Sequence, residues 1–66
     1  MRVTVNGGDR ELPEGLALLA LLDQLGLRPG TVVVERNGEA LVRSELDGVV
    51  LADGDRLELV RAVAGG

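Results

Sequence analysis

Only one segment of this sequence has the residue spacing of an amphipathic helix, and this limits the folds available to the chain. Four leucines fall at positions i, i+3, i+4 and i+7, which form a single apolar stripe on a helix. They are Leu18, Leu21, Leu22 and Leu25. Gly26 suits the residue just past the end of such a helix. One helix with one stripe can cover one face of one sheet.

The segment before this helix has the pattern of a β-hairpin. Val3 and Val5 alternate with polar residues, which is typical of a half-buried strand. Gly7-Gly8 favours a tight turn, and residues 9–12 have the pattern of the returning strand.

The segment after the helix contains further strands. Residues 32–34 are three consecutive valines, which is typical of a strand buried on both faces. Asn37-Gly38 predicts a hairpin turn into a weaker strand at 40–42, and the polar residues 43–48 predict irregular structure. Residues 56–63 form the last expected strand. We therefore expect an α+β roll: a mixed sheet of four or five strands with one helix packed across one face.

The composition excludes several functions. The 66 residues include no cysteine and no histidine, so we expect no disulfide, no metal site, no bound cofactor and no catalytic residues. The absence of aromatic residues and the net charge of −4 argue against a nucleic-acid partner. No apolar run is long enough to span a membrane, and the sequence passes from Met1 straight into a strand pattern. We expect a cytoplasmic protein.

The sequence ends in small residues that suggest a reactive tail. We expect a folded domain at 1–63 and a flexible tail at 64–66, because Ala64, Gly65 and Gly66 have almost no apolar area to bury. The plain interpretation is a frayed end. The functional interpretation is that a partner enzyme activates the carboxylate of Gly66. The tail residues are small enough to pass through a narrow channel in that enzyme.

Two further groups of residues have both a plain and a functional interpretation. If Leu57 and Leu59 face the helix, Val60 faces the other side of the sheet, where Val33 can join it in an apolar patch for a partner enzyme. The plain alternative is scattered surface aliphatics. Five acidic residues have no metal-loop spacing and predict only a solvated surface. They are Asp9, Glu11, Glu14, Asp53 and Asp55.

Three segments of the sequence resemble the ThiS family of sulfur carriers from thiamine biosynthesis. They are Val33–Leu46 with its Asn-Gly-Glu hairpin, Leu51–Val60 with its Leu-Ala-Asp-Gly-Asp turn, and the terminal Ala-Gly-Gly. The leading strand and the leucine-rich helix fit as well, so the resemblance covers the whole chain. Departures are Val42 where members often have proline, Leu46 where an aromatic residue is common, and Ala64 in place of a third glycine.

The resemblance implies a ubiquitin-like β-grasp fold and a mechanism. An E1-like (ThiF-like) enzyme adenylates the Gly66 carboxylate, and a persulfide-bearing sulfur donor protein converts it to a thiocarboxylate. The sulfur is then delivered to a ThiG-like thiazole synthase, and the carrier itself catalyses nothing. The alternatives are the small subunit of molybdopterin synthase, a protein-tagging modifier, and an inert β-grasp interaction module.

Overall fold

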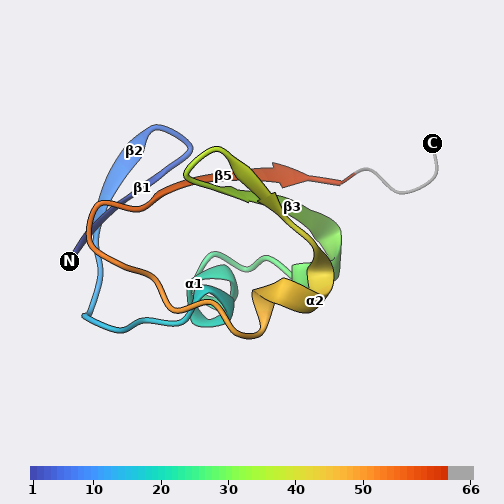
Figure 1. The fold of residues 1–66 in the computed structure, drawn as a ribbon, viewed down its shortest axis with the longest axis horizontal. Helices are drawn as coiled ribbons and strands as arrows, with labels where there is room; N and C mark the ends of the chain where they lie inside the picture. The colour runs from blue at the N-terminus through green and yellow to red at the C-terminus, as the bar shows by residue number, and fades with distance from the viewer. Residues whose placement is uncertain (63–66) are drawn as a thin grey trace.

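The computed structural model describes residues 1–62, and these form one five-stranded sheet with helical segments on one side (Figure 1). The α+β class and the single main helix are confirmed. In chain order the elements are β1 (Arg2–Val5), β2 (Gly8–Glu11), α1 (Leu18–Gln24), a 3₁₀ turn (Pro29–Thr31), β3 (Val32–Arg36), β4 (Glu39–Leu41), α2 (Arg43–Leu46) and β5 (Arg56–Arg61).

The strands are arranged in the order β2-β1-β5-β3-β4, which makes the sheet mixed. The first and last strands, β1 and β5, pair in parallel at the centre, and every other pair is antiparallel. A parallel pair requires a long crossover between its strands. Here all the other elements, from β2 to α2, lie between the two strands in the sequence, so strands from its two ends become neighbours.

Helix α1 follows the predicted stripe closely. Leu18, Leu21 and Leu22 are completely buried, while Leu25 is half-buried just beyond the last helical turn. Gly26 adopts a positive φ of 72° after the helix. The N–H of Leu27 donates to the carbonyl of Leu22 at 2.9 Å, which closes the helix in the way that a glycine at this position allows.

The core lies between α1 and the inner face of the sheet and is entirely aliphatic. The inner face alternates with the outer face along each strand, as Leu57 and Leu59 on β5 illustrate. The buried hydrophobic residues are Val3, Leu12, Leu18, Leu21, Leu22, Val32, Val34, Leu46, Leu51, Leu57 and Leu59.

The first hairpin turns one residue earlier than predicted. Val5 pairs with Gly8, so the two turn residues are Asn6 and Gly7, with φ values of 49° and 83°. Both residue types tolerate the positive φ of this turn. The prediction placed the turn at Gly7-Gly8 because it gave the two glycines more weight than the Asn-Gly pair beside them.

Two other predictions about local structure were wrong. Residues 43–48 are not irregular throughout, because Arg43–Leu46 forms the short helix α2, in which Leu46 is buried and the Glu45 carboxylate accepts a hydrogen bond from the Val42 N–H at 2.8 Å. Strand β3 is not buried on both faces, since Val33 is 45% exposed between two buried valines. Both helices lie on the same side of the sheet and leave its other face open (Figure 1).

Candidate functional site

Val33 and Val60 stand directly opposite each other on the open face of the sheet. They are partners in the antiparallel register of β3 and β5, and their exposed fractions are 45% and 59%. The predicted placement of both residues on one face, away from the helix, is therefore confirmed. We call this pair the valine patch; its role in binding a partner stays a prediction.

Two carboxylates lie next to the valine patch on the same two strands, two residues after Val33 on β3 and two residues before Val60 on β5. Glu35 pairs directly with Glu58, and both side chains are exposed on the same face as the valine patch. Like charges that are directly opposite in a sheet repel each other. Arg56 lines the same surface pocket of about 290 Å³ as these two glutamates, yet no ion pair within 4 Å joins it to either carboxylate. This arrangement favours a partner that brings positive charge to the surface.

Strand β5 carries the chain from this surface toward the terminal residues. Its pairing with β3 ends at Arg61, and the N–H of Ala62 then donates to the carbonyl of Thr31 at 2.8 Å. The predicted tail residues Ala64, Gly65 and Gly66 lie outside the described residues. Val60 of the valine patch is two residues before Ala62, where the hydrogen bond to Thr31 forms.

Asn6 fastens the end of β1 to β5. Its side-chain oxygen accepts from the Leu59 N–H at 2.7 Å, and its side-chain nitrogen donates to the Leu59 carbonyl at 3.2 Å. The side-chain amide of Asn6 thus makes the pair of hydrogen bonds that a backbone residue would make if the β1–β5 pairing continued. Sequence reasoning missed this residue, although the Asn-Gly pair marked it.

The described part of the chain offers little else to a catalytic or metal-binding function. No group of three or more Asp, Glu, His or Cys side chains within residues 1–62 could hold a metal ion. No helix in this range is long and apolar enough to cross a membrane.

Comparison with known proteins assigns the family. The model of the ThiS family matches residues 3–66. This chain belongs to the ThiS family. The crystal structure of a thiamine biosynthesis protein (ThiS) from Geobacter metallireducens is similar over the full length of both chains, with 36% identity and a TM-score of 0.84. A solution structure of a thiamine biosynthesis protein from the same organism has a TM-score of 0.79 at 36% identity, over all of this chain and 88% of the other.

Two curated relatives are much longer than this chain. A thiazole synthase from Paramagnetospirillum magneticum is 38% identical over all 66 residues, and another from Magnetococcus marinus is 36% identical. The chain spans only 20% of the length of each. In these proteins a ThiS-like segment therefore belongs to the same polypeptide as a thiazole synthase.

The motifs that resemble the ThiS family meet in space. Asp55, from the turn before β5, accepts hydrogen bonds from Asn37 of the β3–β4 hairpin at 3.0 Å and from the Ala52 N–H at 2.9 Å. Its carboxylate also forms an ion pair with Arg36, at 2.9 Å from Nη2. We call these four residues the Asp55 cluster. The expectation that Asp55 is part of a solvated surface was wrong, since this residue is only 6% exposed.

The Asp55 cluster keeps its carboxylate charged. Burial by itself would raise the pKa of Asp55. Hydrogen bonds from the Ala52 N–H, Asn37 and Arg36, together with the positive charge of Arg36, outweigh this effect and lower the pKa below its usual value. The cluster joins the β3–β4 hairpin to the start of β5, at the same end of the β3–β5 ladder where Arg36 pairs with Leu57.

Proposed function

We propose that this ThiS-family chain is a sulfur carrier for thiazole formation in thiamine biosynthesis, with the carboxylate of Gly66 as its working group. The family match carries the proposal, because it runs through the whole domain to Gly66. The similarity to a thiamine biosynthesis protein over the full length of both chains supports it further.

The proposed chemistry has three steps. A carboxylate oxygen of Gly66 attacks the α-phosphorus of ATP on an E1-like adenylating enzyme, and pyrophosphate leaves. The terminal sulfur of a persulfide on a donor protein then attacks the acyl carbon, and AMP leaves. A thiol finally reduces the resulting acyl disulfide, which leaves a thiocarboxylate on Gly66 and a disulfide on the other two sulfurs.

In this proposal the chain presents its Gly66 carboxylate to the partner enzymes and does not itself catalyse a reaction. The sequence has no histidine or cysteine to act as base or nucleophile, so we propose that the partner enzymes supply the chemistry. Residues 1–63 act as the recognised domain and residues 64–66 as the tail that enters a partner. We propose the cytoplasm as the site of this exchange, since it requires ATP and the partner enzymes.

The open face of the sheet is the proposed docking surface for the adenylating enzyme. The valine patch supplies apolar area, and the Glu35–Glu58 pair selects a partner with basic side chains. The proposed sulfur acceptor is a thiazole synthase, supported by the curated relatives in which a matching segment is part of such an enzyme.

Deletion of Gly66 tests the proposal. We expect the shortened chain to lose ATP–pyrophosphate exchange with the adenylating enzyme of the same source, while its melting temperature stays unchanged. Ala64→Gly is the matched control, because it keeps the length of the tail and should retain exchange. Exchange by the shortened chain at the wild-type rate would favour the inert interaction module.

Mass spectrometry separates the remaining alternatives. The chain isolated with its partners should carry sulfur in place of one carboxylate oxygen of Gly66. A covalent conjugate to a protein lysine would instead indicate a modifier. Sulfur transfer to a molybdopterin precursor, with none to a thiazole synthase, would indicate a molybdopterin-synthase subunit.

A further inference from the structure

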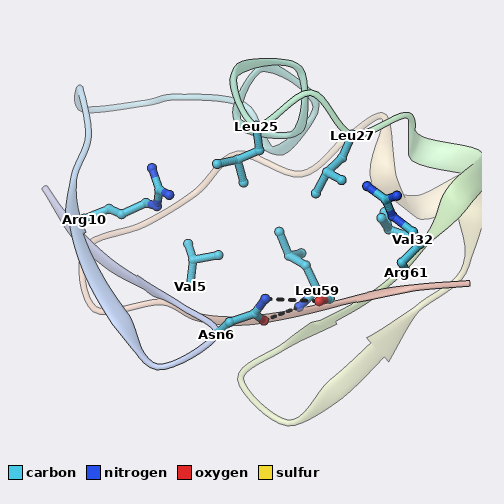
Figure 2. A pocket seen from close by; sticks show the side chains of 8 residues that line it. All are labelled: Val5, Asn6, Arg10, Leu25, Leu27, Val32, Leu59 and Arg61. Carbon is cyan, nitrogen blue, oxygen red and sulfur yellow. Dashed lines mark hydrogen bonds between the residues drawn. The ribbon is translucent and has the colours of Figure 1, made fainter.

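A pocket opens between the end of α1 and the inner face of the sheet (Figure 2). Its volume of about 440 Å³ is within the range of ordinary binding pockets. It exists because α1 has seven residues and is therefore only about 10 Å long, too short to cover the inner face as far as the end of β5. The apolar lining comes from both layers: Val5, Val32 and Leu59 from the sheet, and Leu25 and Leu27 from the helix end.

Two arginines occupy opposite ends of this pocket (Figure 2). The strand register explains their position, since Arg10 pairs with Val3 and Arg61 pairs with Val32, so both arginines share the inner face with core residues. No acidic side chain lines the pocket among the described residues, and no ion pair or side-chain hydrogen bond within residues 1–62 engages either guanidinium group.

These charges stand out because the whole chain is acidic, with a net charge of −4. Among residues 1–62, the one other polar side chain in the lining is Asn6, and both its amide atoms are already bonded to the backbone of Leu59. The pocket therefore offers an apolar centre and two available cationic groups. A segment that fits this pocket would place an apolar side chain in the centre and a carboxylate near each arginine.

The two faces of strand β5 carry side chains of opposite charge near its C-terminal end. Val60 and Glu58 face outward to an acidic surface, whereas Leu59 and Arg61 face inward to a basic pocket. A segment suited to the pocket would be repelled by the Glu35–Glu58 pair, and the single Arg56 beside them offsets only part of that repulsion, so such a segment favours the pocket. Two proteins that handle the same tail in succession can thus be distinguished by charge.

We propose that this pocket docks the sulfur-accepting protein through a segment that places an apolar side chain beside carboxylates. The inference rests on the proposed function, in which one protein activates the tail and another receives sulfur from it. The outer face serves the activating enzyme and the pocket serves the acceptor.

The test measures both partners with one set of variants. The double variant Arg10→Gln/Arg61→Gln removes the two charges, and Arg43→Gln removes one exposed charge on α2 as a control. With thiazole synthase of the same source as the probe, the double variant should bind at least about tenfold more weakly by calorimetry. Arg43→Gln should bind as the wild type does. The loss should shrink at high salt, because exposed charges are then screened.

The same variants should support ATP–pyrophosphate exchange by the adenylating enzyme within about twofold of the wild type. Unchanged binding of the double variant to the synthase, or no binding of the synthase by the wild type, would overturn the inference. An equal loss of exchange and synthase binding would also overturn it, since the pocket would then serve both partners. Failure of the proposed function has a different signature: no exchange with the wild-type chain.

Discussion

At the scale of single residues, the Asp55 cluster joins segments that are far apart in the sequence. It joins the β3–β4 hairpin to the start of β5 through a charged carboxylate that is only 6% exposed. A buried carboxylate is tolerated only when hydrogen bonds and a counter-charge replace its water. Here the Ala52 N–H, Asn37 and Arg36 donate the hydrogen bonds, and Arg36 is also the counter-charge. No buried side-chain nitrogen or oxygen among the described residues is left without a hydrogen-bond partner.

The lowered pKa of Asp55 predicts loss of stability in acid. In the folded chain this carboxyl holds its charge to lower pH than in the unfolded chain, so the unfolded chain takes up a proton first as pH falls. The stabilisation is therefore present above the unfolded pKa of about 3.9 and is lost as pH falls through the lower folded value.

Urea unfolding of the wild type and of Asp55→Asn at pH 7 and pH 3 measures this effect. We expect the stability difference between the two proteins to be larger at pH 7, because only the wild type loses a favourable charge on acidification. Asp47→Asn, in an exposed ion pair with Arg43, is the control and should change little at either pH. An equal difference at both pH values would contradict the assigned role of Asp55.

At the scale of elements, α1 depends on its buried stripe and on the residue that ends it. Its N-cap, Ala17, offers no side-chain hydrogen bond, so capping does little to start the helix. A helix of seven residues is not stable alone in water, and packing against the sheet must hold it in place. Changes to the stripe and to Gly26 should therefore affect the free energy of unfolding differently.

Leu22→Ala should destabilise the chain by about 2–5 kcal/mol, because it removes buried apolar area and leaves a cavity in an aliphatic core. Leu19→Ala is the matched control, since the half-buried Leu19 lies at the edge of the stripe and should cost clearly less. Chemical unfolding measures both. Equal losses in the two variants would show that the stripe is not the anchor of the helix.

Gly26→Ala should destabilise the chain by about 1–2 kcal/mol, because a side chain disfavours the positive φ of 72° at this position. No atom lies within 4 Å of the added methyl carbon, so the cost is one of backbone conformation alone. Gly48→Ala has the same open space without a positive φ and should be neutral or slightly stabilising. Melting curves of both variants provide the comparison, and a neutral Gly26→Ala would contradict the helix-ending role of Gly26.

At the scale of the whole molecule, the topology places both proposed docking surfaces at one end of β5. The central parallel pairing of β1 with β5 and the antiparallel pairing with β3 embed this strand in the sheet. Pairing with β1 covers Arg56 and Leu57, and pairing with β3 continues to Arg61, so β5 keeps a fixed register with the valine patch on one face and the arginine-lined pocket on the other. Partners bound to either face would lie beside the end of β5.

Val60→Asp should weaken binding to the adenylating enzyme while leaving the melting temperature nearly unchanged. Val60 is 59% exposed in the free chain, but an added carboxylate beside the Glu35–Glu58 pair would be desolvated against a partner and would increase repulsion. Val60→Ala, which removes apolar area without charge, should have a smaller effect. Binding measured by calorimetry that is unchanged in Val60→Asp would remove the valine patch from the proposed interface.

The sequence by itself determined the features that depend on local spacing and local backbone conformation. The leucine stripe, the end of α1 at Gly26 and the Asn37-Gly38 turn follow from side-chain period and from residues that tolerate positive φ. The alternation of β5 also placed Val60 away from the core. Such patterns are visible within a few residues, so the sequence predicted them correctly.

Only the tertiary structure decided which distant residues meet. Asp55 lies 18 positions from Asn37, and Asn6 lies 53 positions from Leu59. No local pattern therefore reveals that Asp55 bonds to the Asn37 side chain or that Asn6 bonds to the Leu59 backbone. The exposure of Val33 follows from the sheet having one uncovered face, which the run of three valines does not show. The arginine-lined pocket likewise depends on the length of α1 and on strand register, because both its walls come from segments far apart in the chain.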